Sequence, residues 1–328
     1  MTSMPSKPSK KRLGLIDPAV ANDINLGDHI ISAAVRTTLI DDLGLVETAR
    51  VPSIRPLTRV QRRSLRAADV VVVGGTNLLS SNMNVYNQWK VNLLDLARLP
   101  RVVLMGVGWW QYQPAPNVYT RLLLRGLLDR RLLHSVRDGY TADMLASAGI
   151  HNVVNTSCPT LWQLDAATQR EIPVRRAREV VCTLTCYNMR PELDRPLLEL
   201  LDELYDRVIL WPQGNDDLEY CRSLGVETDH LPHTVDAFDD LLRDSPDVDY
   251  VGTRLHAGVR ALQNRKRALV LTIDNRAEQI GEDTGLPVVA RDDLASIRGW
   301  INKSDPVAIK LPRLDIQRWL AQFRTLQS

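Results

Sequence analysis

Aromatic residues are scarce in this sequence: they form 5% of its 328 residues, and phenylalanine occurs only at Phe238 and Phe323. Proteins that bind single-stranded nucleic acid stack bases on exposed aromatic rings, so the scarcity argues against that class. The net charge is only +2, whereas a dedicated nucleic-acid-binding domain carries a marked excess of basic charge. We therefore expect no nucleic-acid partner.

Cysteine is also scarce, with four residues at Cys158, Cys182, Cys186 and Cys221. None of them forms a C-x-x-C pair, and no pair of histidines completes a zinc pattern, so we expect neither a metal nor a cofactor. Cys182 and Cys186 are four residues apart on an expected strand, which would place both side chains on one face. Four such thiols are typical of buried, reduced cysteines, and we expect a cytoplasmic protein.

Long apolar segments are absent as well. No run of the sequence approaches the roughly 18 apolar residues that a membrane-spanning helix needs. Residues 1–12 are polar and basic without the apolar centre of a signal peptide, and we expect them to form a disordered, solvated tail. The alternative is peripheral contact with the inner face of an anionic membrane, through Lys7, Lys10, Lys11 and Arg12.

What the chain does have is an alternation of short apolar runs with helical patterns. Continuous apolar strands separated by helices predict parallel sheets covered on both faces. We therefore predict an α/β fold of two doubly wound, Rossmann-like domains that face a cleft, where the carboxyl ends of the strands bind ligands. The expected strands are 13–16, 69–73, 101–105, 132–136, 180–185, 208–211, 248–251 and 268–273. The main expected helices are 28–39, 86–96, 118–128, 190–205, 216–224, 235–242, 254–263, 276–282 and 314–326.

The polar, arginine-rich segment 166–178, with Pro173, separates two similar halves and is the expected linker. This assignment places an N-terminal domain at 13–165 and a C-terminal domain at 179–305. Residues 306–328 carry the last helix, which could cross back onto the first domain.

Polar residues follow several of the expected strands. After the first strand come Asn25, Gly27 and Asp28, where Gly27 would let a ligand approach the backbone and Asp28 would be a good helix N-cap. Gln213 follows a strand of the second half and could donate amide hydrogen bonds. In isolation an Asx-rich turn with a cap is the better explanation of the first group.

Two glycine pairs follow strands of the first half, Gly74–Gly75 and Gly106 with Gly108. Each can form a tight turn that presents backbone N–H groups to a ligand. Neither pair completes a phosphate-binding fingerprint, because the spaced glycines and the lysine of those motifs are missing. Together with the other strand-end residues, they favour one shared binding cleft.

The segment 249–257, DYVGTRLHA, limits the possible functions of this protein more than any other segment. It is typical of a strand that ends near Gly252 and a helix that begins near Arg254, so Arg254 and His256 would lie on the first helical turn. Backbone N–H groups are unpaired there and the helix dipole is positive. A permanent cation beside an imidazole makes a site for a small anion that exchanges a proton. In isolation we would favour a structural arginine and a packed histidine; the other strand-end residues favour the site.

Two further strand ends carry charged residues. Asp138 can cap the helix after the strand at 132–136 and Arg137 can point toward the cleft, with a surface ion pair as the alternative. Asp274 follows the strand at 268–273, where it is either a carboxylate near His256 or the N-cap of the next helix. Both interpretations of Asp274 fit the sequence equally well.

With these residues in place, the chain resembles the polysaccharide pyruvyl transferase family. The R-L-H-A and V-R-D motifs are the specific elements, the glycine loops are generic, and the resemblance extends from about residue 13 to residue 290. The family is similar to two-domain glycosyltransferases of the GT-B architecture. Its characterised members transfer the enolpyruvyl carbons of phosphoenolpyruvate to a sugar and form a pyruvate ketal. The matching segments are 25–28 (NLGD), 69–75 (DVVVVGG), 106–108 (GVG), 135–138 (SVRD) and 252–257 (GTRLHA), with Asp274.

The resemblance implies that this protein transfers a pyruvyl group from phosphoenolpyruvate to a polysaccharide, a glycan precursor or a lipid-linked saccharide. The first domain would bind the acceptor and the second the donor. Arg254 and Arg137 could each hold one anionic group of the donor, and His256 suits the proton transfer. Asp28 or Asp274 could act on the acceptor hydroxyl. A glycosyltransferase of the same fold with a nucleotide-sugar donor is the alternative.

The sequence also departs from the family pattern. Trp109 and Trp110 follow Gly108, where the family often has Gly-Pro, and Tyr140 and Thr141 replace the serine that often follows R-D. We expect these differences to alter the acceptor side more than the donor side.

Overall fold

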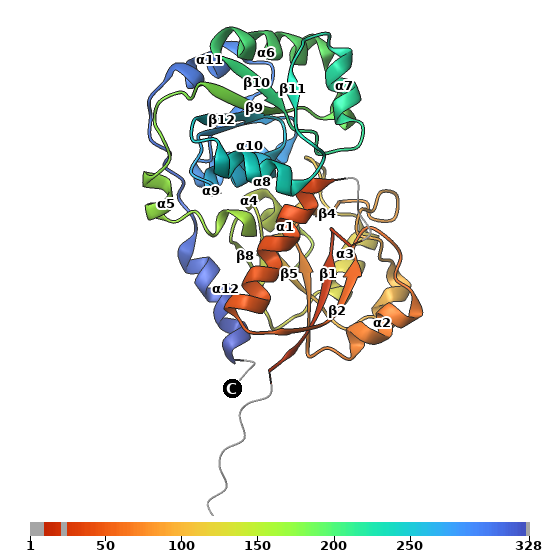
Figure 1. Ribbon diagram of the computed structural model, residues 1–328. Coiled ribbons are helices and arrows are strands. Elements are labelled where there is room, and N and C mark those ends of the chain that lie inside the picture. Colours follow the sequence, from red (N-terminus) through yellow and green to blue (C-terminus); the bar gives the residue numbers. More distant parts are fainter. Residues whose placement is uncertain (1–9, 21–24, 326–328) are drawn as a thin grey trace, which may run out of the picture. The chain divides into compact units, whose positions relative to one another are not determined.

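A computed structural model describes residues 10–20 and 25–325, which form two compact units (Figure 1). The first unit comprises residues 10–20, 32–159 and 312–325; the second comprises residues 25–31 and 160–311. The chain thus passes between the units after residue 159 rather than within 166–178, and helix α5 (Ala166–Arg170) occupies the start of that expected linker.

The centre of the first unit is a parallel sheet with the strand order β2-β1-β3-β5. Strand β3 (Val70–Gly74) is buried along its whole length, as expected for a strand covered on both faces. It pairs on one side with β1 (Arg12–Asp17) and on the other with β5 (Val103–Met105), while β2 (Val46–Pro52) forms the edge. Two further parallel pairs follow: β4 (Asn77–Leu79) with β6 (Gly108–Trp109), and β7 (His134–Val136) with β8 (Val153–Asn155).

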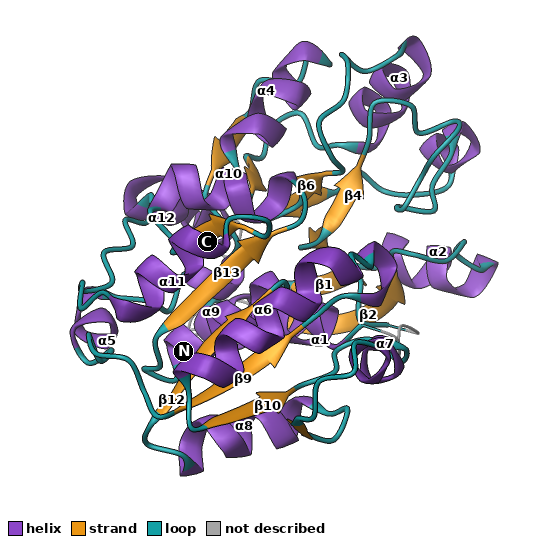
Figure 2. Ribbon diagram, turned by 90° about the horizontal axis from the view of Figure 1, so that it is seen from above, coloured by secondary structure: helices purple, strands orange, loops and turns teal. Residues whose placement is uncertain are grey.

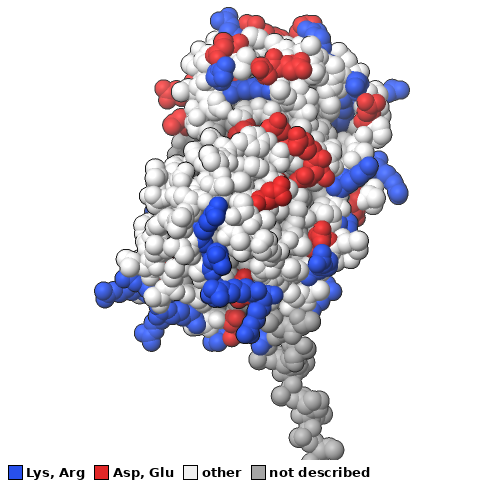
Figure 3. Space-filling view, turned by 180° about the vertical axis from the view of Figure 1, so that it is seen from behind, with Lys and Arg blue, Asp and Glu red and all other residues white. Residues whose placement is uncertain are grey.

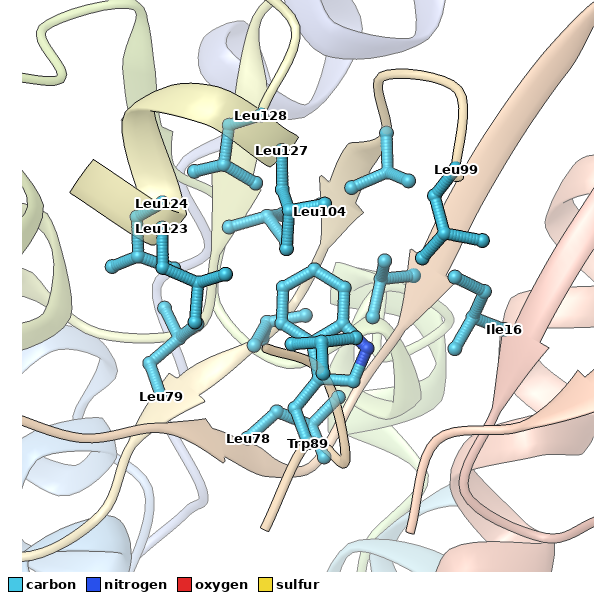
Figure 4. Close-up of a cluster of buried hydrophobic side chains, with 14 of the residues drawn as sticks. Ile16, Leu78, Leu79, Trp89, Leu99, Leu104, Leu123, Leu124, Leu127 and Leu128 are labelled. Atoms are coloured by element: carbon cyan, nitrogen blue, oxygen red, sulfur yellow. The ribbon is translucent and has the colours of Figure 1, made fainter. Parts of the chain in front are cut away.

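A large apolar core lies on one side of this sheet, around the buried Trp89 (Figure 4). Leucines of α3 pack into it together with Leu78, Leu79 and Leu104. Burial of such side chains stabilises the unit by about 1.5–3 kcal/mol for each one. The helices that end or lie in this unit are α1 (Leu26–Arg36) with its π-helical continuation (Thr37–Asp42), α2 (Arg59–Arg66), a 3-10 turn (Leu93–Ala97), α3 (Val118–Leu127), α4 (Gly139–Ser147) and α12 (Arg313–Thr325).

The helix predicted over 86–96 is wrong. Residues 86–92 have no regular secondary structure, and only Leu93–Ala97 wind into a 3-10 turn. The amide of Asn87 donates to the carbonyl of Val91, and the side chain of Asn92 accepts from the N–H of Leu94. Asparagine side chains that bond to nearby backbone groups compete with helical hydrogen bonds, which explains the break.

The C-terminal helix α12 packs on β7 and β8 of the first unit. Its Gln322 accepts from the N–H of Leu133 at 2.7 Å and donates to the carbonyl of the same residue at 3.1 Å. The amide thus satisfies both backbone groups of a residue just before β7, as a neighbouring strand would.

The second unit contains a six-stranded parallel sheet with the order β11-β10-β9-β12-β13-β14. Numbered within this unit, the order is 3-2-1-4-5-6, that of dinucleotide-binding Rossmann domains. The strand order reverses between β9 and β12, and ligands of this topology bind at the carboxyl ends of the strands beside that point. The strands are β9 (Glu179–Thr183), β10 (Arg207–Leu210), β11 (Asp229–His230), β12 (Val248–Gly252), β13 (Ala268–Thr272) and β14 (Val288–Ala290).

Helices cover both faces of this second sheet (Figure 1 and Figure 2). Trp211 is buried and stacks on Phe238 of α8 with 4.0 Å between ring centroids, so it is a core residue. Besides α5 and the start of α1, the helices are α6 (Pro191–Leu204), α7 (Asp217–Ser223), α8 (Val235–Asp244), α9 (Leu255–Gln263), α10 (Asn275–Thr284) and α11 (Leu294–Asn302).

The prediction that Cys182 and Cys186 share one face of a strand is wrong. Strand β9 ends at Thr183, and Cys186 opens a 3-10 turn (Cys186–Asn188) because its N–H bonds to the carboxylate of Asp217. Cys182 is buried, and burial raises the pKa of its thiol well above the usual range, whereas Cys186 is only partly buried.

The expected basic tail at 1–12 falls mostly on residues 1–9, which lie outside the described part. Arg12 does not belong to such a tail: it begins β1 and forms an ion pair with Asp69 at 2.9 Å. On the face shown in Figure 3, basic and acidic side chains both occur and large areas carry no charge. None of the helices in the described residues is long and apolar enough to cross a membrane.

Candidate functional site

The carboxyl ends of β9 and β12 meet where the strand order of the second unit reverses. Gly252 ends β12 against Thr183 of β9, and a Cβ on this glycine would lie 2.7 Å from the backbone N and O of Thr183. The glycine is therefore required for the close approach of the two strands, and its contact with a substrate stays a prediction. Thr253 continues this packing through a 2.7 Å hydrogen bond between its hydroxyl and that of Thr185.

Arg254 follows directly and occupies the N-cap position of α9. Its Nη2 donates to both carboxylate oxygens of Asp217, at 2.8 and 2.5 Å. Asp217 also accepts from the backbone N–H groups of Cys186, Gln213 and Gly214, at 2.8 to 3.1 Å. Burial disfavours the charged form of Asp217, but Arg254 and these N–H groups outweigh it, so the pKa of Asp217 lies below its usual range.

Two buried donors beside this ion pair have no hydrogen-bond partner in the described residues: Nε of Arg254 and Nε2 of Gln213. The two side chains are only 7% and 1% exposed. A buried unpaired donor costs about 1–3 kcal/mol, and more when the group is charged. The arrangement therefore suits a ligand that brings acceptor oxygens, such as a carboxylate or a phosphate.

The first residues of α1 lie beside the side chains of Gln213 and His256. The N–H of Leu26 donates to the carbonyl of Gln213 at 3.1 Å. A Cβ on Gly27 would lie 3.6 Å from both Oε1 of Gln213 and Nδ1 of His256, so the bare backbone of Gly27 faces these two side chains. His256 is buried in the first turn of α9. The structure thus brings Gly27, Gln213, Arg254 and His256 together, although they are far apart in the sequence.

We expected Asp28 to be the N-cap of α1, and this prediction is wrong. It lies inside the first turn, where it is buried, and Asn25 precedes the helix and accepts from the N–H of Gly27 at 3.1 Å. The amide of Asn25 also donates to the Asp28 carboxylate at 3.3 Å. The helix begins two residues earlier than predicted because Asn25 satisfies its first free N–H group.

Asp274 is the N-cap of α10, accepting from the N–H of Arg276, and it also pairs with the guanidinium of that arginine. Nη2 of Arg276 donates at 2.8 Å to the hydroxyl of Tyr187, whose ring lies 5.0 Å from the guanidinium carbon of Arg254. Tyr187 therefore contacts both arginines, and its side chain is 59% exposed. The sequence indicated neither Tyr187 nor Arg276, because no motif contains them.

The glycines predicted to bind ligands in the first unit have internal roles in this structure. A Cβ on Gly106 would lie 2.1 Å from the ring of Pro159, and one on Gly74 would lie 3.0 Å from Val35. Gly75 has φ of 58° and donates its N–H to the carbonyl of Met105 at 2.8 Å. Close packing and a turn with positive φ therefore account for these glycines.

Arg137 is buried at the end of β7, with 1% of its surface exposed. Its Nη2 donates to Oδ1 of Asn77 and its Nε donates to the carboxylate of Asp138 at 3.3 Å. Gly108 leaves room for the guanidinium, since a Cβ there would lie 2.2 Å from Nε. Asp138 caps α4 by accepting from the N–H of Thr141 at 2.7 Å. The pair is not at the surface, and its contact with a substrate stays a prediction.

The cluster around Arg254 offers three kinds of chemistry. The arginines and the amide can hold an oxyanion, the start of α9 adds its dipole, and His256 can exchange a proton. Across residues 10–20 and 25–325, no three His, Cys, Asp or Glu side chains lie close enough to hold a metal ion.

Solved structures with the same fold include the following three. Staphylococcus aureus MnaA with UDP matches with a TM-score of 0.54 at 13% identity, over 96% of this chain and 97% of the other. The UDP-GlcNAc 2-epimerase of Methanocaldococcus jannaschii gives the same TM-score and identity, over 96% and 99%. The Rickettsia bellii 2-epimerase matches with a TM-score of 0.51 at 13% identity, over 97% and 96%. These likenesses confirm the predicted class, an α/β protein of two Rossmann-like domains with a GT-B-like fold.

The family itself follows from the sequence match. The model of the polysaccharide pyruvyl transferase family matches residues 25–275, so the chain belongs to that family. The matched range includes every residue of the cluster except Arg276. No curated protein matches the sequence. The family indicates a transferase that acts on a polysaccharide or glycan.

Proposed function

We propose that this protein transfers a pyruvyl group from phosphoenolpyruvate to a sugar of a polysaccharide or glycan precursor and forms a ketal. The observation that carries the proposal is the pair of buried, unpartnered donors, Nε of Arg254 and Nε2 of Gln213, beside His256. Such a pair of donors can bind an oxyanion next to an imidazole, a group that can give or take a proton.

In this proposal, Arg254 and Gln213 bind one anionic group of the donor. Asp217 fixes the Arg254 guanidinium from one side, so the remaining donors of Arg254 keep their direction. Arg276 and the Tyr187 hydroxyl lie within reach of the same arginine and would bind the second anionic group. Arg137 is a weaker candidate for that role, because Asn77 and Asp138 already engage its guanidinium.

His256 would give a proton to the methylene carbon of phosphoenolpyruvate, which becomes the methyl group of the ketal. The central carbon then forms bonds to two sugar hydroxyl oxygens, and its bond to the phosphate oxygen breaks. The two hydroxyl protons leave, so that one replaces the proton given by His256 and the other leaves with inorganic phosphate. Asp28, in the first turn of α1, is the carboxylate nearest in sequence to Gly27 and would accept a hydroxyl proton.

The test is incubation of the protein with isotopically labelled phosphoenolpyruvate and a glycan library, followed by mass spectrometry. Ketal formation adds the mass of pyruvate less water and releases phosphate. A parallel incubation with UDP-GlcNAc and other nucleotide sugars tests the glycosyltransferase alternative, which adds a sugar residue. Transfer from a nucleotide sugar, with none from phosphoenolpyruvate, would overturn the proposal.

A further inference from the structure

Two loops of the first unit carry very little charge. Residues 80–92 follow β4 and contain one charged residue, Lys90, and residues 110–117 follow β6 and contain none, although charged residues form 24% of the chain. Both are rich in amide and aromatic side chains. We call their outer side the amide-aromatic surface; its members are Asn82, Asn84, Tyr86, Trp110, Gln111 and Tyr112.

The aromatic rings of this surface are open to solvent. Tyr86 is 40% exposed, Tyr112 is 53% exposed and Trp110 is partly exposed. Tyr86 and Trp110 stack with 4.1 Å between ring centroids, and Tyr112 meets the ring edge of Tyr140 at 5.1 Å. Exposed rings grouped in this way mark binding surfaces, because a protein otherwise buries such area.

Hydrogen bonds join the two loops and hold the surface in place. The N–H of Trp110 donates to the carbonyl of Leu79, and the N–H of Ser81 donates to Oε1 of Gln113. The amide of Asn117 donates to Oδ1 of Asn84 at 2.7 Å. A surface that is already rigid loses little conformational entropy when it binds a ligand.

The surface continues the carboxyl ends of β4 and β6, which lie side by side (Figure 2). Loops at this end of parallel strands form the binding sites of α/β proteins. The Trp109–Trp110 pair also stands where the family often has Gly-Pro, so the aromatic ring of Trp110 distinguishes this chain from that pattern.

We propose that the amide-aromatic surface is the acceptor subsite and that it binds an uncharged pyranose of the glycan. The C–H face of a pyranose is apolar and slightly positive, and it fits the negative face of an aromatic ring. The amides of Asn82, Asn84 and Gln111 provide both donors and acceptors for the sugar hydroxyls. The proposal rests on the glycan acceptor of the proposed function, but it concerns binding rather than transfer.

None of the six members of this surface is charged, and the nearby Lys90 donates its Nζ to the carbonyl of Asn87, which argues against other partners of this surface. An anionic membrane or a nucleic acid would need lysine or arginine among the exposed residues. An acidic, uronate-rich glycan would need them as well. A neutral sugar needs none, and amide groups with aromatic rings suffice to bind it.

Intrinsic fluorescence provides the test. Five of the seven tryptophans are buried, and only Trp110 and Trp300 are partly exposed. The Trp300→Phe variant, titrated with cellotetraose, galactotetraose, mannotetraose and chitotetraose, should show a saturable change with at least one glycan. Adding Trp110→Phe should remove the change. In the same titration Tyr86→Ala should weaken binding about tenfold. Isothermal titration, which needs no tryptophan reporter, should show the same loss for Trp110→Ala, the effect of losing one or two aromatic contacts.

The matched control is Leu122→Ala, which removes an exposed apolar side chain from α3 and should leave binding unchanged. In a transfer assay, the aromatic variants should raise the acceptor KM and leave the affinity for phosphoenolpyruvate unchanged. If Trp110→Ala lowers the thermal midpoint, Tyr112→Ala tests the same surface with a more exposed side chain.

Glycan binding that depends on Trp110, in a protein that forms no ketal, would support this subsite while rejecting the proposed function. Absence of binding to all four glycans at millimolar concentration would overturn the subsite. So would binding that Tyr86→Ala, Tyr112→Ala and Trp110→Ala leave intact, or Trp110-dependent binding to phosphatidylcholine vesicles instead of glycans.

Discussion

Arg254 and Arg137 occupy similar places in the two units. Each follows the last residues of a buried parallel strand, precedes a helix and pairs with an aspartate. Asp138 is the next residue in the chain after Arg137, whereas Asp217 reaches Arg254 from the first residue of α7. The two sites therefore look alike in the sequence and differ in how their donors are used.

The two sites differ in which hydrogen-bond donors of the guanidinium group are already used within the protein. The Nε of Arg137 bonds to Asp138, and Asn77 takes Nη2, while Gly108 fits closely against the group. Nε of Arg254 has no partner among the described residues, and the exposed ring of Tyr187 lies beside it. An arginine held on one side by a carboxylate and unpaired on the other suits ligand binding. An arginine enclosed by its own unit suits stability.

The largest effect expected at the Arg254 site comes from His256→Ala. Loss of a general acid or base lowers the rate by about 10²- to 10⁴-fold, so kcat for ketal formation should fall by that factor. The variant should still fold, although truncating this buried side chain lowers its thermal midpoint. His151→Ala, which alters an exposed histidine of the first unit, should keep full activity. Full activity of His256→Ala would exclude this residue from the chemistry.

Arg137→Ala should act on stability instead. It leaves the buried Asp138 without its cation, and breaking a buried ion pair costs about 3–5 kcal/mol. Urea unfolding of the variant and the wild type measures this difference. Arg318→Ala, which breaks an exposed ion pair on α12, should cost less than about 1 kcal/mol. A stable Arg137→Ala protein with weakened donor binding would make the two arginines equivalent and remove the contrast.

Arg254→Lys should weaken phosphoenolpyruvate binding about tenfold. Lysine keeps the charge, but it cannot hold Asp217 and a ligand oxyanion at the same time with a planar group. Isothermal titration with phosphoenolpyruvate measures the loss, and Arg318→Lys serves as the control. An unchanged dissociation constant would show that the donor binds elsewhere.

The smallest effect concerns acid stability at Asp217. Because its pKa is lowered in the folded state, its charge stabilises the protein above the unfolded pKa of about 3.9, and this contribution is lost as pH falls through the lower folded value. Asp217→Asn removes this titration, so its unfolding free energy should depend less on pH below about 4, by at most about 1.4 kcal/mol per pH unit. Urea unfolding of both proteins between pH 3 and 7 measures this pH dependence and locates the folded pKa of Asp217 to about one pH unit. Identical slopes would contradict the lowered pKa.

Much of the fold could be predicted because central strands carry an unmistakable pattern. Strand β3 is a run of four valines, and it lies in the middle of its sheet as expected. Strands β2 and β14 are edge strands and were missed for different reasons: β2 mixes apolar with polar residues, and β14 is apolar but only three residues long. The family and the fold class predicted from the motifs are confirmed.

The site was predictable only where a motif contained it. Arg254 and His256 stand at the start of α9, close to where the R-L-H-A motif indicated. Asp217, Tyr187 and Arg276 were missed because they lie on three other segments of the second unit, and none of them has a distinctive sequence neighbourhood. Their importance arises from contacts with Arg254 or with one another.

By itself, the sequence determined the class of fold, the family and the position of the arginine and histidine at a helix start. These follow from local causes: apolar runs form buried strands, and a glycine at a strand end allows a helix to begin beside it. The tertiary structure alone decided which arginine keeps a donor free for a ligand. That outcome depends on which distant carboxylates and amides the sheet topology places around each guanidinium, and no local pattern encodes it.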